Sequence, residues 1–432
     1  MKWKLTAVAI AICGAAALSA FTRRTEAPKK TLRPYPKGCV FRTVMGEESS
    51  DNMAIFKSTE RVMTSLDRGL TWIAQAQNKD GGWGAGTHSR QDILDPHAVS
   101  SDPASTSMVA MALLRTGSKT TGGIYSQQLS KAIEYLLTSV EKSRPDQLNI
   151  TSQTGTQIQV KLGQNIDVIL ASQFFSNLLD QIDESPLKER VKNANAVCVR
   201  KIAKATNSDG TIAGSGWAGV LQSSFAANAL ESAEKQGIDV DDKVLAQAKT
   251  FQKGNFDAKT GGVKTDLGAG VVLYSVSGSS RASAKEARRV REEMERAKKD
   301  GRLDSTAPVT SENLEKIGFA PSESRNYATS YEVYEASKVQ AQRDDVLDGF
   351  GNNGGEEFLS YLQTGEGLVI NKDTQWTKWY DNMSGRLLKI QNDDGSWNGH
   401  HCITSPVFCT ATCLLILSVN NDVERLAKLG EK

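Results

Sequence analysis

Apolar positions in this chain recur with the period of an amphipathic helix, and a two-helix unit stands out near the N-terminus. Residues 66–77 place Leu66 and Leu70 on one side of a helix. The run Asn-Lys-Asp-Gly-Gly-Trp-Gly over residues 78–84 interrupts that helix. Residues 105–114 then predict a second helix that is apolar on almost every side, and such a helix has to be buried. The pattern therefore predicts an amphipathic outer helix, a turn and an inner helix.

The same unit returns about three hundred residues later. Residues 383–391 read as the amphipathic helix, residues 392–397 as the turn and residues 410–417 as the apolar helix. In both copies a Gln stands six positions before a Trp, with Asp-Gly between them. Such internal repetition predicts stacked helical hairpins. Weaker helix signals lie between the two copies, over residues 165–182, 191–205, 223–233, 244–252 and 327–339.

Two stretches depart from the repeat. Residues 277–302 are rich in Ser and then densely charged, which predicts a solvated helix held by charge pairs at helical spacing, or alternatively a binding arm. Residues 148–160 are rich in Thr, Gln and Ile, and a short strand pair is the structure that we expect there.

The N-terminus has the order of a secretory signal peptide. A short basic start precedes the apolar run Leu5–Phe21, and small residues come just before Arg23. An uncleaved anchor is the alternative, since the run is near the lower limit for spanning a bilayer. We therefore expect an exported protein, periplasmic or extracellular, with no membrane span after signal cleavage. The expected organisation is a signal peptide over 1–21, a flexible linker over 22–57, the repeat body over 58–420 with a charged insertion near 277–325, and a C-terminal tail over 421–432.

Composition narrows the function only slightly. The chain has 432 residues and a net charge of +2, so bulk charge gives no reason to expect a nucleic-acid partner. It has 6 cysteines, of which Cys13 would leave with the signal. Export permits disulfides, but so few cysteines do not make a disulfide scaffold, and a hydrophobic core has to supply the stability.

The two complete repeats resemble the QW repeats of squalene and oxidosqualene cyclases and of protein prenyltransferase β-subunits. The resemblance is carried by residues 77–83 (Gln-Asn-Lys-Asp-Gly-Gly-Trp) and 391–397 (Gln-Asn-Asp-Asp-Gly-Ser-Trp). It implies the terpenoid-cyclase-like fold class: an all-α, α/α toroid with an outer ring of amphipathic helices and an inner ring of apolar ones. The repeat residues are expected to be structural, with each Trp covering a hairpin end while its indole nitrogen finds a carbonyl. These residues are Gln77, Asp80, Trp83, Gln391, Asp394 and Trp397.

The catalytic signatures of that family are not matched. The acidic Asp-x-Asp-Asp motif of bacterial squalene cyclases has its letters at residues 239–242, but these lead into a polar helix start, where acidic residues favour the helix dipole. Residues 344–348 do not fit the Asp-Asp-x-x-Asp motif of diphosphate-ionising synthases.

The densest group of reactive side chains is His400-His401-Cys402, just after the second repeat turn. Imidazole and thiolate are zinc ligands, so zinc is a possible cofactor here. The resemblance adds that prenyltransferase β-subunits bind zinc through an Asp, a Cys and a His, although no full alignment places that set. A disulfide between Cys402 and Cys409, or thiols packed in the core, are the structural alternatives.

Acidic side chains offer further candidates for catalysis. Asp102 precedes the inner helix of the first unit, whose cap we expect at Ser105 or Thr106, and the nearby loop also carries His88 and His97. Glu356 and Glu357 follow a Gly pair that permits close backbone approach, and they begin another helix. A carboxylate at a helix start is usually a cap or a dipole partner, whereas a buried Glu with a raised pKa can act as an acid.

Three functions remain open from the sequence. The first is a binding or structural toroid of the cell envelope, holding an apolar ligand or an envelope protein. The second is a metal-dependent or acid-catalysed enzyme acting on an isoprenoid-like substrate. The third is a polysaccharide lyase or hydrolase, because α/α toroids also carry such enzymes. Aromatic residues make up only 6% of the chain, and a cavity that stabilises carbocations needs many. The sequence therefore favours binding.

Overall fold

The computed structural model describes residues 58–351 and 353–430, which are helical and contain no β-strand. The predicted signal peptide and the linker before Ser58 lie outside these residues. Polar turns join the helices, and only isolated bridges between loops occur in the described part of the chain.

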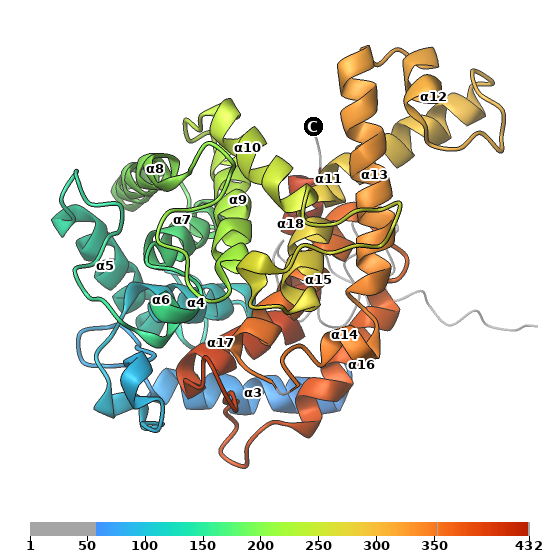
Figure 1. The fold of residues 1–432 in the computed structure, drawn as a ribbon. Helices are drawn as coiled ribbons and strands as arrows, with labels where there is room; N and C mark the ends of the chain where they lie inside the picture. The colour runs from blue at the N-terminus through green and yellow to red at the C-terminus, as the bar shows by residue number, and fades with distance from the viewer. Residues whose placement is uncertain (1–57, 352, 431–432) are drawn as a thin grey trace, which may run out of the picture. The chain divides into compact units, whose positions relative to one another are not determined.

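The inner helices form a closed ring. Each contacts the next along the chain, and the last contacts the first, which completes the ring (Figure 1). Most of their residues are buried, as the apolar patterns of residues 105–114 and 410–417 predict. These helices are α4 (Pro103–Arg115), α7 (Ile166–Leu179), α9 (Gly219–Lys235), α11 (Val272–Lys299), α15 (Gly355–Asn371) and α17 (Pro406–Leu417).

The outer helices alternate with the inner ones along the chain and pack against them. Each is buried along one side and exposed along the other, so the predicted toroid of alternating outer and inner helices is confirmed. One of them, α5, was not expected from the sequence, although its apolar residues follow helical spacing. The outer helices are α3 (Glu60–Gln75), α5 (Ser126–Lys142), α8 (Pro186–Ala205), α10 (Asp242–Lys253), α13 (Pro321–Gln340) and α16 (Trp376–Lys389).

The two complete repeats have the same geometry. Trp83 and Trp397 are fully buried, and their indole nitrogens donate to the carbonyls of Ile73 at 2.8 Å and Leu387 at 2.9 Å. The Gln side chains donate back to the turns, Gln77 to Gly81 O and Gln391 to Gly395 O, each at 2.8 Å. Asp80 and Asp394 accept from the backbone amides of Gly82 and Ser396 within these turns. These contacts of all six residues are made within their own hairpins, as a structural role requires.

The cap of α4 differs from the expected one. Asp102 caps this helix by accepting from Ser105 N at 2.7 Å, while Ser105 and Thr106 lie inside its first turn. Asp102 also accepts from Ala85 N at 2.8 Å, so it ties the repeat turn to the helix that follows. An Asp at the N-cap satisfies amides that have no partner inside the helix, which explains its full burial.

The charged stretch after residue 276 is a continuation of an inner helix. Helix α11 runs over 28 residues, and its Ser-rich part from Ser277 to Ser283 is buried inside the ring. The prediction of a solvated helix is wrong for that half, because its small residues allow close packing with α15. The later half leaves the ring and, with α12 (Ser311–Lys316) and α13, encloses a small separate apolar core (Figure 1).

The C-terminus is also more ordered than expected. The predicted tail contains η4 (Val419–Asp422) and α18 (Val423–Leu429), and α18 packs on α15 through buried Leu426 and Leu429. Among the described helices, none is by itself long and apolar enough to cross a membrane; α17 and α18 reach that length only as a pair bent by 63°.

The inner face of the ring is unusually polar. Gln173 in α7, Asn228 in α9, Ser280 in α11 and Gln363 in α15 are all buried. Each has a side-chain nitrogen or oxygen without a hydrogen-bond partner among the described residues. Buried polar groups are costly unless they are paired, so this interior suits water or polar groups better than an apolar molecule.

Candidate functional site

The first and last repeats meet at the end of the ring where the inner helices begin. Gln157 joins them: its amide nitrogen donates to Ala85 O at 2.9 Å, and its amide oxygen accepts from Thr404 N at 2.8 Å and Ser405 N at 3.2 Å. Gln157 is fully buried, so water cannot replace the hydrogen bonds that its amide nitrogen and amide oxygen make.

Gln157 belongs to a short helix rather than to a strand. Helix α6 (Gln157–Lys161) begins at Thr156, whose hydroxyl accepts from Gln159 N at 3.1 Å, while the Gln159 side chain accepts from Thr156 N. This reciprocal cap fixes a helix start, so the predicted strand pair over 148–160 is wrong. The Thr and Gln residues that suggested a strand are used here in capping.

The loop before α9 closes over the end of α6. Trp217 N donates to Val160 O at 3.3 Å and Ala218 N donates to Lys161 O at 2.7 Å. A Cβ on Gly216 would lie 2.6 Å from Val160 O, so only glycine allows this approach. The backbone contacts therefore hold Trp217 directly beside Lys161.

Lys161 and Trp217 form a cation–aromatic pair. The Lys161 ammonium lies 4.4 Å from the centre of the Trp217 ring. Lys161 is 6% exposed, whereas Trp217 is 63% exposed. No described carboxylate forms an ion pair with Lys161 within 4.0 Å. A buried ammonium thus lies under an exposed indole.

Cys402 lies against Lys161 and has a strained backbone. Its φ of 61° is in the left-handed region that a cysteine rarely adopts. Gln91 holds this conformation by donating from its side chain to Cys402 O. Burial raises the pKa of the Cys402 thiol to about 11, Glu356 adds to this, and a hydrogen bond with Lys161 opposes it. The group is therefore a thiol at neutral pH, not a reactive thiolate.

Glu356 and Glu357 begin α15, and the structure gives them different surroundings. Glu357 accepts from Gly354 N at 2.9 Å, Phe350 N at 3.2 Å and the Tyr274 hydroxyl at 2.5 Å. Three donors suit a carboxylate, and the bond from Gly354 completes a helix cap, so the capping alternative is confirmed for Glu357.

Glu356 has a weaker set of partners. It accepts from Ile403 N at 3.3 Å and is 2% exposed. Burial raises its pKa to about 8, the neighbouring Glu357 raises it further, and the charge of Lys161 opposes the shift. Glu356 is consequently protonated at neutral pH, as the alternative of a buried acid requires. We call Lys161, Trp217, Cys402 and Glu356 the ring-end cluster.

The sequence candidates for metal binding do not come together. No group of three or more His, Cys, Asp and Glu side chains suited to a metal ion occurs in the described chain. His400 is exposed, and His401 packs its ring against Phe350 at 5.3 Å between centroids. The geometry therefore does not support a zinc site at His400, His401 and Cys402.

Of the two structural alternatives for the cysteines, the disulfide between Cys402 and Cys409 is not formed. Both are free thiols: Cys402 lies in the loop before α17, whereas Cys409 is buried inside the helix. Cys413 lies one turn further along the same helix and is buried as well, which is the alternative of thiols packed in the core.

Asp102 and the two loop histidines do not join the cluster as acids or ligands. Burial, followed by the neighbouring Asp167, raises the pKa of Asp102 to about 7, but its oxygens are occupied by Ser105 and Ala85. His97 is exposed. The pKa of His88 is lowered by burial and then by the charge of Lys161. The loop contacts the cluster through Gln91, whose side chain donates to Cys402 O.

Sequence reasoning missed Lys161, Trp217 and Tyr274. Each lies in a different repeat and none belongs to a recognisable motif. The only local signal was the run Gly214-Ser215-Gly216-Trp217, in which an apolar side chain follows a flexible turn. That signal indicates an exposed aromatic residue, but it does not predict that Lys161 lies beside it.

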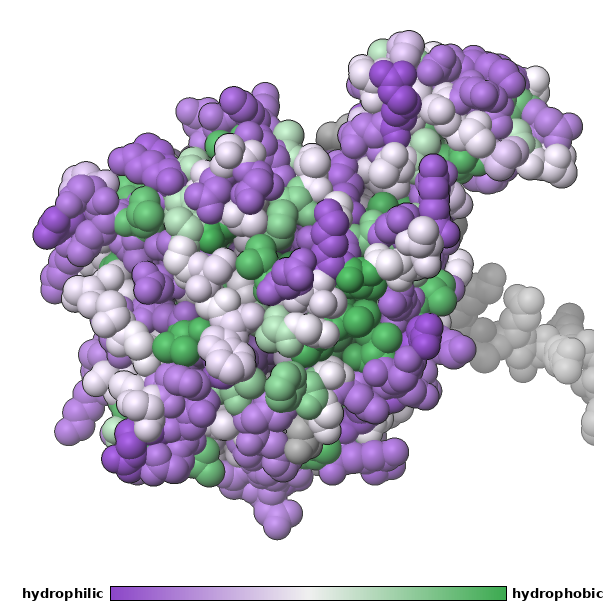
Figure 2. All heavy atoms as spheres, viewed as in Figure 1, coloured by the Kyte–Doolittle hydropathy of each residue, from purple (hydrophilic) through white to green (hydrophobic). Residues whose placement is uncertain are grey.

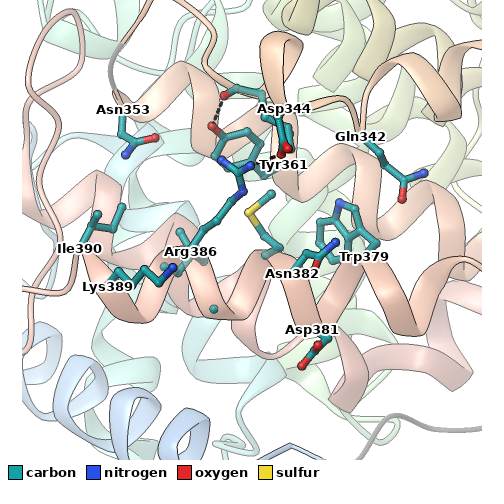
Figure 3. A pocket seen from close by; sticks show the side chains of 14 residues that line it. Gln342, Asp344, Asn353, Tyr361, Trp379, Asp381, Asn382, Arg386, Lys389 and Ile390 are labelled. Carbon is teal, nitrogen blue, oxygen red and sulfur yellow. Dashed lines mark hydrogen bonds and ion pairs between the residues drawn. The ribbon is translucent and has the colours of Figure 1, made fainter.

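A separate cavity of about 700 Å³ lies between α14 (Asp344–Leu347), α15 and α16 (Figure 3). Trp379, Asp344 and Arg386 line it, and Arg386 forms an ion pair with Asp344. None of the residues of the ring-end cluster lines this cavity. On the face shown in Figure 2, polar residues predominate and apolar residues form scattered groups.

Comparison with known proteins agrees with this fold. Residues 50–157 match the family model of the squalene-hopene cyclase C-terminal domain. None of the curated proteins compared with the chain matches it.

Solved structures with a similar course of helices include two forms of the type II terpene cyclase MstE from Scytonema. The apo form is 12% identical, with a TM-score of 0.44, over 84% of this chain and 98% of that one. A substituted form with geranylgeranyl dihydroxybenzoate bound is 11% identical, with a TM-score of 0.43 over the same shares. A glycosidase variant is 11% identical, with a TM-score of 0.42, over 87% of this chain and 100% of that one. By its repeats and its closed double ring, the chain is an α/α toroid that resembles the terpenoid cyclases, and its residues 50–157 match the family model of the squalene-hopene cyclase C-terminal domain.

Proposed function

We propose that this protein is an exported toroid that binds a polar ligand at the ring-end cluster. The observation that carries the proposal is the exposed indole of Trp217 over the buried ammonium of Lys161, 4.4 Å away. An exposed indole offers an apolar face with a polar edge, and an ammonium beneath it offers charge. Binding sites commonly combine such a surface with a few polar groups held by a rigid frame.

The polar interior supports a polar ligand over an apolar one. Gln173, Asn228 and Gln363 are buried in the ring, and each has a polar atom with no hydrogen-bond partner in the described part of the chain. An isoprenoid chain held inside the ring, rather than at the ring-end cluster, would leave these atoms unpaired, at a cost of about 1–3 kcal/mol each. The isoprenoid alternative is therefore the less favoured of the functions considered.

Binding of defined small ligands tests this proposal. Neutral and acidic oligosaccharides, with geranylgeraniol as the apolar comparison, are titrated into residues 22–432 by calorimetry. We expect at least one saccharide to bind, Trp217→Ala to abolish that binding, and Trp217→Phe to retain most of it because the aromatic face remains. Arg386→Ala, in the separate cavity, serves as the control and should bind as the wild type does. Binding of geranylgeraniol with no saccharide bound would reverse the conclusion.

A second candidate function is acid-catalysed hydrolysis of the bound ligand, and Glu356 is the observation that favours it. Its buried carboxyl group is protonated at neutral pH and lies one residue from the carboxylate of Glu357. In such a reaction the acid gives its proton to the bridging oxygen as the C–O bond breaks. Water then supplies the hydroxyl group, and its released proton restores the acid.

Product analysis distinguishes hydrolysis from binding alone. New reducing ends should form from a bound oligosaccharide with the wild type and not with Glu356→Gln, which keeps the shape but has no acid proton. Unchanged saccharide after long incubation with the wild type would leave the protein as a binder. Turnover by Glu356→Gln equal to that of the wild type would mean that another residue is the general acid.

Export is the part of the proposal that rests on residues 1–21, whose order is that of a signal peptide. Cell fractionation and N-terminal sequencing of the recovered protein test it. A chain beginning near residue 21 in the periplasm or the medium supports cleavage, and an intact N-terminus in the membrane fraction supports the anchor instead.

A further inference from the structure

The charge of Lys161 has no carboxylate counterpart among the residues that the structure describes. Lys161 is 6% exposed, and the described residues include none that forms an ion pair with it. Buried charges in proteins are normally paired, because an unpaired charge loses its hydration and receives nothing in return. We propose that the ligand of the ring-end cluster is an anionic sugar residue, whose acidic group pairs with Lys161 while its ring packs on Trp217. This inference rests on the binding function proposed above.

The neighbours of Lys161 leave this charge unbalanced. Cys402 meets it as a neutral thiol, and Glu356, whose pKa burial raises to about 8, is protonated. Glu357 is engaged by Gly354, Phe350 and the Tyr274 hydroxyl. The nearby anions are therefore neutralised or occupied, which leaves the ammonium available to an acidic group of a ligand.

The surroundings of Trp217 favour a sugar as the carrier of that group. Lys161 lies on the Trp217 ring, yet the indole is still 63% exposed, so much of its surface is open. The exposed Gln164 lies beside the same loop, with its amide oxygen 3.4 Å from the position of a Cβ on Gly214. Gln91, half-buried, lies next to Cys402. Amides donate and accept, and together with an aromatic face they match a flat ring that bears hydroxyl groups.

A carboxylate and a sulfate on the sugar would pair with Lys161 in the same way, because an ammonium acts as a point charge. Both are anionic sugars, and the test separates them. An acidic peptide is a different class of ligand: it supplies carboxylates but no ring to pack on Trp217.

Calorimetry with matched ligands tests the inference. Trigalacturonate, its carboxyl-reduced form and a sulfated trisaccharide are compared on residues 22–432, with triglutamate as the peptide. We expect an anionic saccharide to bind at least tenfold more tightly than the reduced form, since a charge-assisted hydrogen bond contributes about that much. Added salt should weaken the anionic ligand and leave the reduced one unchanged.

Substitutions assign the preference to Lys161. Lys161→Met should bring the anionic saccharide down to the affinity of the reduced form, while Lys161→Arg should keep most of the preference. Lys259→Met removes an exposed lysine from the turn after α10 and is the matched control. Because Lys161 is buried, its variants are first compared by thermal unfolding, and Lys161→Gln, which also removes the charge, serves as the test if the Met variant does not fold.

The outcomes separate this inference from the function on which it rests. Equal affinity for anionic and reduced saccharides, both lost in Trp217→Ala, would overturn the anionic preference and leave the binding site in place. Binding of triglutamate and of no saccharide would overturn the assignment of the ligand as a sugar. Binding of no ligand by the wild type would overturn both.

Discussion

Identical residue types have different roles in this protein, and their surroundings decide which. Trp397 is buried and bonded to Leu387 O, while Trp217 is exposed beside Lys161. Glu356 and Glu357 are neighbours in the chain, yet one is a buried acid and the other a helix cap. At the scale of the residue, burial and the number of donors determine the chemistry.

The repeat tryptophans should contribute strongly to stability. Trp397→Phe removes the bond to Leu387 O and leaves a gap at the hairpin end, so we expect a loss of about 2–4 kcal/mol in the free energy of unfolding. Trp217→Phe, at an exposed position, should change it by less than about 0.5 kcal/mol. Urea denaturation followed by circular dichroism measures both. Similar losses in the two variants would mean that the burial of Trp397 does not account for its contribution to stability.

Glu356 should make stability depend on pH. Its pKa is about 8 in the folded chain, against an ordinary value of 4.5, so between these values the folded state holds a proton that the unfolded state has released. The contribution of Glu356 to the free energy of unfolding is then fully present below about pH 4.5, falls as the pH rises, and is lost above about pH 8. One unit of pKa corresponds to about 1.4 kcal/mol, so the free energy of unfolding should change by several kcal/mol at most over this range.

The matched measurement is the unfolding midpoint of the wild type and Glu356→Gln at pH 5, 6.5 and 8. The Gln variant has no proton to lose, so its midpoint should fall less over this range. Parallel curves for the two proteins would show that Glu356 titrates normally.

At the scale of the element, α11 combines two environments in one helix. Its first half lies in the ring through small residues such as Gly278 and Ser279, and its second half packs through Val290 and Met294 in a separate core. Its sequence changes from Ser-rich to charged where the helix leaves the ring. The helix therefore links the ring to the small core that it shares with α12 and α13.

This small core should open independently of the ring. Leu314→Ala in α12 removes a fully buried side chain, and a loss of about 2–4 kcal/mol there should expose the later half of α11 and the start of α13. Hydrogen exchange should rise over residues 285–330 and stay unchanged in α4 and α17. Leu230→Ala in α9 is the matched control and should lower the main unfolding transition. The same effect from both variants would argue for one cooperative unit.

At the scale of the whole molecule, contacts between repeats that are distant in sequence close the ring. Gln157 joins the repeats at one end, and Arg68 reaches the turn of the last repeat by donating to Asn392 O at 2.9 Å. Elsewhere in the ring, Arg115 at the end of α4 pairs with Glu366 at 2.5 Å and with Asp422 at 3.0 Å. All three of these side chains are buried or nearly so.

Removal of the Arg115 guanidinium should destabilise the ring. Arg115→Met leaves Glu366 buried without its cation, and we expect a loss of about 3–5 kcal/mol in the free energy of unfolding. Arg343→Met breaks an exposed pair with Asp345 and should have no measurable effect. Chemical denaturation compares the two. A small change for Arg115→Met would mean that Glu366 finds another partner or a proton.

The sequence by itself determined the repeat, its turns and the alternation of outer and inner helices. These follow from local rules: helical periodicity, the Asp-Gly turn, and a Gln and a Trp at fixed spacing that bind the backbone of their own hairpin. The tertiary structure alone decided that Lys161 meets Trp217 and Cys402, that Ser277–Ser283 is buried, and that Cys402 and Cys409 stay apart. These outcomes depend on closing the ring, because closure brings side chains from different repeats together, and burial then sets their charges.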